Sequence, residues 1–364
     1  MKINERIIER IILGVFVLLL IGSWIFFLVD PIGKSVAEEN NPKGQYSSLE
    51  EVAMENISIK KIECVDPVQK DIELIGKMTG LRELQLYNLT GEIDLSPLEG
   101  LIDLEKISLS VLYGELDTRP LAKLQQLKEI YIEGGEIDYA FLKELNNVET
   151  LTTNRNGIEN LNFFAHMKKL ERLSLHCVFN ADFQQLENLE KLSSLELYVG
   201  DDLENIECLG NLSSLSNLKV ENGSLHNENL VNLGFLKGLK SLRSLNLINI
   251  EVESIKPVEE LNLKALSLSN VINAEGGLEL ESIGKLGALE YLCLKNMTLS
   301  SVEPLRKLDS LEDLMLDNVD VEGIEPLKEL VNLKYLRISG NISEQVKEQA
   351  ELYFSHVERV EIWE

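Results

Sequence analysis

The sequence is poor in cysteine, in aromatic side chains and in positive charge. Four cysteines in 364 residues are too few to cross-link a chain of this length, which excludes a disulfide-stabilised scaffold. Aromatic residues make up only 6% of the chain, whereas leucine is plainly overused. This composition is typical of a repetitive protein and argues against a compact enzyme.

Basic residues are strongly outnumbered by acidic ones. The chain has 35 Lys and Arg against 61 Asp and Glu, which gives a formal net charge of −26. A nucleic-acid-binding surface needs clustered positive charge to displace counterions, so we expect no nucleic-acid partner. An anionic membrane surface would also repel the body of this chain.

The sequence also lacks a recognisable set of catalytic or metal-binding residues. It has neither a glycine-rich phosphate loop nor a nucleophile elbow. The acidic cluster at residues 201–204 lacks the alternating oxygen ligands and the glycine of a calcium loop. No two of the four histidines share a helix face or an alternating strand spacing: His166, His176, His226 and His356. We therefore expect no enzymatic activity, no metal and no cofactor.

One long apolar run stands near the start of the chain. Residues 11–29 carry no charge, and 19 residues at ~1.5 Å each can cross a hydrocarbon core of ~30 Å. Lys2, Arg6 and Arg10 precede this run, so the positive-inside rule places residues 1–10 in the cytoplasm and the rest of the chain outside. We expect a single-pass protein of the cell membrane, held there only by this N-terminal helix.

A second interpretation of this segment is a signal peptide. Residues 35–37 form a small-x-small triplet, which a signal peptidase could cleave after Ala37. The apolar run is long for a signal peptide, so we favour a retained anchor. Residues 30–47, which contain Pro31, Gly33 and Pro42, are then a linker to the remainder of the chain.

The rest of the sequence is one repeat. The pattern L-x-x-L-x-L, with other apolar residues at some positions, recurs 14 times, from Ile59-Ile62-Cys64 to Val357-Val360-Ile362. Ten of the 13 spacings between copies lie between 21 and 23 residues. A single unit cannot bury its leucine face, so stacked units should place 14 short strands in one parallel sheet.

This repeat resembles the leucine-rich-repeat family over residues 57–364. The second half of several units reads apolar-x-Pro-Leu, at residues 95–98, 302–305 and 324–327, and with the short period it is most similar to the internalin-type repeats of bacterial surface proteins. The resemblance implies an α/β leucine-rich-repeat solenoid, or horseshoe, with a concave parallel β-sheet, here preceded by one N-terminal transmembrane helix. It also implies that a protein partner binds the concave face.

The turn after each strand departs from the family pattern. The ninth motif position, which is usually Asn, is mostly apolar or Gly, and Asn often stands at the eighth position, as in Asn88, Asn270 and Asn318. We interpret this as a turn variant with a drier interior. Cysteine-rich caps are absent, which favours a bacterial source.

Residues 48–364 form the predicted solenoid, and its open ends need caps. The spacing predicts cap helices over residues 48–56 and 67–78 at the front, and a helix over 344–354 that begins after Ser343 at the back. Two units are longer than the others, and we expect their extra residues, within 222–231 and 271–280, to form loops on one rim.

Tyrosine is concentrated on the concave face. The third, fifth and seventh motif positions point to that face because strand side chains alternate. Five of the nine tyrosines occupy these positions: Tyr87, Tyr131, Tyr198, Tyr291 and Tyr335. Aromatic, methionine and arginine side chains are enriched in the cores of protein interfaces. We therefore expect a partner-binding site at the positions that share adjacent strands near the end of the chain: Tyr291, Lys295, Asp313, Met315, Asp317, Tyr335 and Arg337.

The sequence thus predicts a monomeric, membrane-anchored module that binds a protein at the surface of a bacterial cell. A cleaved, secreted effector or inhibitor with the same fold is one alternative. A glycan-binding surface receptor is another.

Overall fold

The computed structural model describes residues 59–154, 161–178, 182–200, 205–223, 230–273, 278, 280–299 and 301–363. The chain divides into two compact units, Met1–Lys34 and Ser35–Glu364, and all described residues belong to the second. The apolar run 11–29, the linker 30–47 and the cap helix expected over 48–56 lie outside the described residues. Of the helices that are described, none has the length and apolar character that crossing a bilayer would require.

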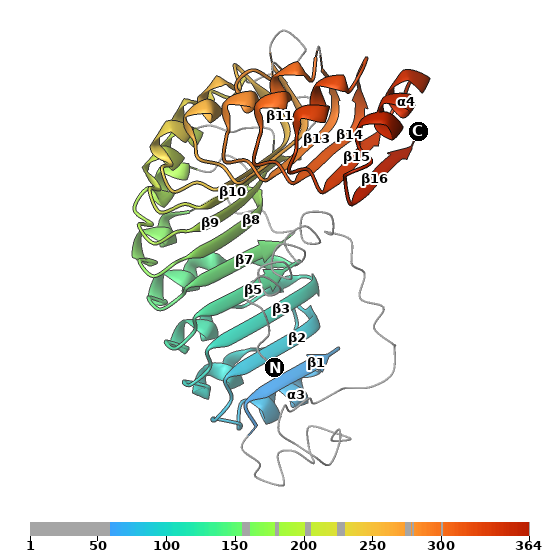
Figure 1. The fold of residues 1–364 in the computed structure, drawn as a ribbon. Helices are drawn as coiled ribbons and strands as arrows, with labels where there is room; N and C mark the ends of the chain where they lie inside the picture. Colours follow the sequence, from blue (N-terminus) through green and yellow to red (C-terminus); the bar gives the residue numbers. More distant parts are fainter. Residues whose placement is uncertain are drawn as a thin grey trace, which may run out of the picture. The chain divides into compact units, whose positions relative to one another are not determined.

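The strands confirm the repeat. Fourteen parallel strands form one sheet in chain order, each centred on one copy of the motif (Figure 1). They are β1 (Lys61–Val65), β2 (Glu83–Thr90), β3 (Lys106–Tyr113), β5 (Glu129–Glu133), β7 (Thr150–Asn154), β8 (Arg172–Val178), β9 (Ser194–Val199), β10 (Asn217–Asn222), β11 (Ser244–Val252), β12 (Ala265–Asn273), β13 (Tyr291–Thr298), β14 (Asp313–Asp320), β15 (Tyr335–Ser339) and β16 (Arg359–Trp363). The short strands β4 (Glu115–Leu116) and β6 (Glu136–Ile137) pair separately.

The return segments contain short 3₁₀ helices, which line the side of the solenoid opposite the sheet (Figure 1). Proline stands at the first or second position of five of them, where its missing N–H removes no helical hydrogen bond. They are η1 (Ser96–Gly100), η2 (Arg119–Lys123), η3 (Tyr139–Glu144), η4 (Asn162–His166), η5 (Phe183–Leu186), η6 (Ile206–Asn211), η7 (Leu233–Gly238), η8 (Lys256–Glu260), η9 (Ile283–Lys285), η10 (Glu303–Lys307) and η11 (Glu325–Glu329).

The core is a continuous column of leucine and isoleucine between the sheet and the return segments. The fourth and sixth motif positions are buried throughout most of the sheet, as Leu314 and Leu316 of β14 illustrate, with no exposed surface on either. This arrangement follows from the sequence, because the alternation of a strand sends these two positions to the same side.

Asparagine at the eighth motif position reverses this alternation. Asn88, Asn249, Asn270, Asn296 and Asn318 have left-handed backbones, with φ between 51° and 60°. Asparagine tolerates this conformation better than other residues with side chains. The turn sends the ninth residue back into the core, so the expected drier interior is confirmed at the apolar ninth positions Leu89, Ile250, Val271, Met297 and Val319, all of which are buried.

These asparagines also bond to one another across the sheet. Asn270 Nδ2 donates to Asn249 Oδ1 at 2.6 Å, and Asn318 Nδ2 donates to Asn296 Oδ1 at 3.0 Å. At the front of the sheet, Asn88 Nδ2 donates to Asp66 Oδ1 at 3.1 Å. A ladder of side-chain amides therefore takes the place of the usual ninth-position asparagine.

The caps match the expectation in part. Helix α4 (Glu344–Tyr353) begins after Ser343, whose hydroxyl accepts a hydrogen bond from the Val346 N–H, as predicted. Helix α3 (Gln69–Ile75) is shorter than the predicted 67–78. Its N-cap is Val68, whose N–H donates to Asp71 Oδ2 at 2.9 Å, and its C-cap is Gly76.

The expected rim loops lie mostly outside the described residues. Their preceding strands, β10 and β12, are parallel members of one sheet and so end at the same edge. The loops themselves remain a prediction.

Candidate functional site

We call the surface made by the third, fifth and seventh motif positions the open face of the sheet. Its side chains alternate with core side chains, as in β5, where Glu129, Tyr131 and Glu133 are partly exposed and Ile130 and Ile132 are buried. The fifth position is itself buried in three strands, at Ser108, Asn246 and Met315. Parallel register places equivalent positions side by side on neighbouring strands. The open face can therefore be read strand by strand.

The first strands of the open face carry charges that pair with each other. Lys61 Nζ lies 3.0 Å from Glu83 Oε1, and Lys106 Nζ lies 4.0 Å from Glu83 and 3.3 Å from Glu129 Oε2. Burial raises the pKa of Glu83, but hydrogen bonds from Lys61 and Gln85 outweigh burial, and the net pKa is lowered. This part of the face is therefore a self-neutralised ladder with little charge left for a partner.

A stacked cluster occupies the middle of the open face. The rings of His176 and Tyr198 stack with their centroids 3.6 Å apart, and Lys219 Nζ lies 4.2 Å from the Tyr198 centroid. Burial, and then the charge of Lys219, lowers the pKa of His176 to about 4. Sequence reasoning gave His176 no role, although its seventh motif position beside Tyr198 was a usable signal.

The residues predicted as a partner site do come together at the end of the sheet. Tyr291 pairs in register with Asp313, and Asp313 pairs with Tyr335. Lys295 lies beside Asp317, and Met315 lies beside Arg337. All seven predicted residues therefore occupy the open face of the three consecutive strands β13, β14 and β15.

Their exposure differs from one to the next. Met315 is only 5% exposed, and its Sδ accepts a hydrogen bond from the Tyr291 hydroxyl at 3.4 Å. Burial raises the pKa of Tyr291 and that of Asp313. Lys295 is exposed, and it has no ion pair with any residue of the described segments. Met315 thus supports Tyr291 from within the face, whereas Lys295 projects from it.

Strand β16 completes this cluster with residues that the sequence analysis did not include. The Tyr335 hydroxyl donates to Glu361 Oε2 at 2.7 Å. Arg337 Nε lies 3.2 Å from Asp317 Oδ1, and its guanidinium lies 4.5 Å from the Trp363 ring centroid. Burial and the hydrogen bond to Glu361 raise the pKa of Tyr335 to about 12. The signal was present in the sequence, because the last motif copy places Glu361 and Trp363 at the fifth and seventh positions.

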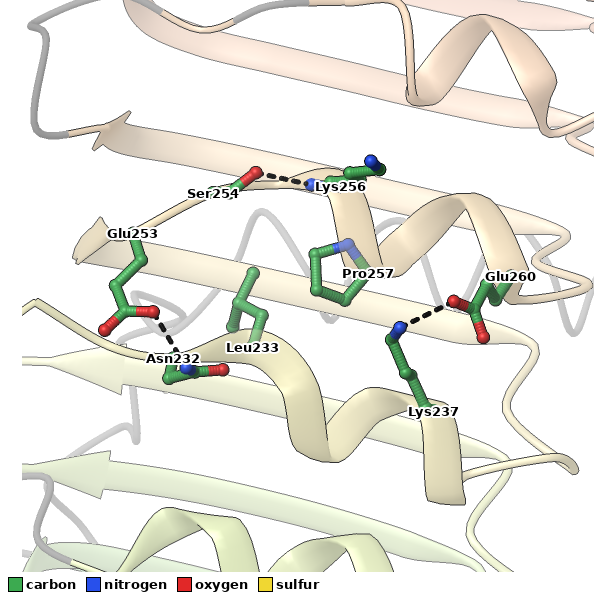
Figure 2. A pocket seen from close by; sticks show the side chains of 8 residues that line it. All are labelled: Asn232, Leu233, Lys237, Glu253, Ser254, Lys256, Pro257 and Glu260. Atoms are coloured by element: carbon green, nitrogen blue, oxygen red, sulfur yellow. Dashed lines mark hydrogen bonds and ion pairs between the residues drawn. The ribbon is translucent and has the colours of Figure 1, made fainter.

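One small cavity lies on the helical side, between η7 and η8 (Figure 2). Its volume is about 210 Å³, below the range of most small-molecule sites. Three pairs of its lining residues bond to each other (Figure 2). Asn232 Nδ2 donates to Glu253 Oε2 at 2.7 Å, Lys237 Nζ lies 2.7 Å from Glu260 Oε1, and the Lys256 N–H donates to Ser254 Oγ at 3.1 Å. Within the described segments, no three His, Cys, Asp or Glu residues are grouped as a metal site would need. The cavity therefore does not offer a built ligand site.

Comparison with solved structures agrees with this architecture. An internalin, InlF, from Listeria monocytogenes superposes with a TM-score of 0.63 at 20% identity, over 90% of this chain and 92% of the internalin. The chain folds as a leucine-rich-repeat solenoid. A plant peptide hormone receptor, RGFR1, solved with RGF2, gives a TM-score of 0.54 at 21% identity over 81% of this chain and 49% of the receptor. The ectodomain of the Arabidopsis thaliana receptor kinase GASSHO1, solved with Casparian strip integrity factor 2, gives a TM-score of 0.54 at 17% identity over 86% of this chain and 42% of the ectodomain.

These similarities show a shared fold. No protein-family model matches the sequence. No curated protein matches it either.

Proposed function

We propose that this protein is a membrane-anchored binding module, which presents its solenoid outside a bacterial cell and captures a protein partner on the open face. The observation that carries the proposal is the cluster on β13 to β16. There, two tyrosines, an arginine and a tryptophan lie on adjacent strands. Tyr291 bonds to Met315, Tyr335 bonds to Glu361, and Arg337 lies between Asp317 and the Trp363 ring. Rigid aromatic anchors with an arginine are the side chains that dominate protein interfaces.

Contacts within the cluster support this role because they hold the anchors in place. Tyr335 is fixed by Glu361, and Arg337 is fixed between Asp317 and Trp363. A side chain that is already ordered loses little entropy when a partner binds. The peptide hormone receptor RGFR1 was solved with RGF2, which is consistent with a protein or peptide partner for a solenoid of this fold.

The proposed partner has a basic surface. The chain carries a net charge of −26, which supports a basic partner at long range; within the cluster, Asp313, Asp317 and Glu361 are balanced by Lys295, Arg337 and Arg359. Complementary charge speeds association and is screened by salt. We therefore expect the association rate with the partner to fall as ionic strength rises.

A pair of double variants tests the site. Tyr291→Ala/Tyr335→Ala removes both anchors and should weaken partner binding by at least ~2 kcal/mol, about thirtyfold in Kd. Tyr87→Ala/Tyr131→Ala, on the same face but among the paired charges of the first strands, is the matched control and should bind as the unmodified chain does. If calorimetry gives equal affinities for the two variants, the partner does not bind at Tyr291 and Tyr335.

The membrane location is tested separately. With a C-terminal tag on the full chain in its bacterial host, we expect the tag in the membrane fraction and open to protease added to intact cells. A soluble form that begins at Glu38 would instead support the secreted alternative.

A further inference from the structure

The last strand of the sheet leaves apolar side chains uncovered. At the fourth motif position, Leu314 and Leu336 have no exposed surface, whereas Val360 of β16 is 38% exposed. Trp363, at the end of β16, is 41% exposed, and Leu352 of the adjacent helix α4 is 70% exposed. At the opposite edge of the sheet, the equivalent Ile62 of β1 is fully buried. The uncovered surface is therefore particular to the β16 end.

The backbone of β16 is also available for pairing. Its hydrogen bonds run to β15, and on its other side it pairs with no strand that the structure describes. An edge strand of this kind accepts a strand from another chain unless its side chains prevent pairing. The charged side chains of β16 therefore determine which strands can pair with it.

The charges of one copy of β16 are complementary to those of a second, antiparallel copy. Arg359 and Glu361 lie on the open face on either side of Val360, have opposite signs, and form an ion pair within the strand that two copies could exchange. If two copies of β16 run antiparallel about a two-fold axis at Val360, each Arg359 lies opposite Glu361 of the other copy. An axis at Arg359 or at Glu361 would instead place like charges opposite each other, which is unfavourable.

Head-to-tail stacking is disfavoured by the same test. A copy that continued the parallel sheet would place its β1 beside β16, with Lys61 facing Arg359 and Glu63 facing Glu361. Both pairs carry like charges. The two-fold arrangement is closed and isologous, which is the commonest symmetry of protein assemblies.

We propose that two copies of this chain associate through antiparallel pairing of their β16 strands about Val360, which covers the edge of β16, with Val360 on the core side of the sheet and Trp363 on the open face. The pairing goes beyond the partner proposed for the open face and uses the edge of β16; Trp363 belongs to both surfaces, whereas Tyr291, Tyr335 and Arg337 lie on the open face alone. It differs from the monomer that the sequence analysis expected.

Disulfide trapping in the full chain tests the pairing. In membranes of cells that express the Val360→Cys variant, a mild oxidant should join two chains, because the two Cβ atoms face each other at the axis. The Val331→Cys variant is the control, since Val331 is 72% exposed on a return segment. The unmodified chain, with its four native cysteines, sets the background. Dimer formation by Val360→Cys no greater than by Val331→Cys would overturn the proposal.

Charge reversal tests the register. In the Val360→Cys background, Arg359→Glu alone and Glu361→Arg alone each place like charges opposite each other, and each should lower self-cross-linking at least fivefold. When the two variants are co-expressed with different tags, opposite charges meet again, and cross-links between the two tags should return. Recovery of the mixed dimer also shows that both variants fold. Undiminished self-cross-linking, or no mixed dimer, would contradict the two-fold axis at Val360.

Discussion

At the residue scale, the left-handed asparagines are the most specific feature of this solenoid. Asn270 has φ of 51° and donates to Asn249 across the sheet. A residue with a Cβ but no amide would carry the strain of this backbone, about 1–2 kcal/mol, and would also lose the hydrogen bond. The eighth position therefore combines a backbone requirement with a side-chain one.

Two substitutions at Asn270 separate these requirements. Asn270→Ala should lower the free energy of unfolding by about 2–3 kcal/mol, since it adds strain and removes the bond. Asn270→Gly relieves the strain and should cost only about 1 kcal/mol. Urea denaturation of the two variants measures the difference. If alanine and glycine cost the same, the left-handed backbone is not the source of the effect.

His176 gives the open face a pH response. Its pKa falls from 6.5 to about 4 on folding, chiefly through burial and then through Lys219. Because the folded pKa is the lower one, the stabilising contribution is complete above pH 6.5 and is lost as the pH falls towards 4. The loss should be on the order of 1 kcal/mol, after a discount for the exposed part of the ring.

The variant His176→Phe keeps a ring against Tyr198 but cannot take up a proton. Between pH 6.5 and 4 it should lose less stability than the unmodified chain does, as measured by thermal unfolding at each pH. An NMR titration of the unmodified chain should give the His176 pKa near 4. A value near 6.5 would contradict the stacked geometry.

At the element scale, the strands could be predicted from the sequence because the repeat imposes them. Each apolar triplet must face the core of its neighbours, so one period sets all 14 strands and their register. Helix bounds were less predictable: α3 ends at Ile75, where Gly76 packs against the backbone of Pro97 in the next unit, and apolar spacing that continues to residue 78 does not reveal such a contact. The exposure of individual side chains on the open face could not be predicted from the repeat either. Met315 stands at an open-face position of the motif, but neighbouring side chains cover it.

The back cap depends on the start of helix α4. Ser343 Oγ accepts a hydrogen bond from the Val346 N–H at 3.3 Å, and Val346 is buried against the solenoid. Ser343→Ala should lower the free energy of unfolding by about 1 kcal/mol. Ser343→Asp should retain most of the stabilisation that the serine cap provides, because aspartate also caps helices well. Hydrogen exchange should show faster opening of α4 and β16 in the alanine variant. A uniform increase along the whole sheet would mean that the cap is not a separate unit.

At the scale of the whole solenoid, the open face is divided by its chemistry. The first strands pair Lys61, Glu83, Lys106 and Glu129 among themselves, and their tyrosines, Tyr87 and Tyr131, each bond within their own strand. The last strands gather tyrosine, arginine and tryptophan instead. A partner therefore gains most by binding at the β13 to β16 end, and this is the central claim of the proposed function.

Site-specific photo-cross-linking in the bacterial host tests that claim most directly. A photoreactive phenylalanine in place of Tyr335 should capture a distinct protein on intact cells, and the same group in place of Val331, 72% exposed on a return segment, should not. An adduct of this chain with itself is recognised by its mass and does not count. Capture from position 335 alone is the predicted result; equal capture from both positions, or capture from 331 alone, would contradict the account.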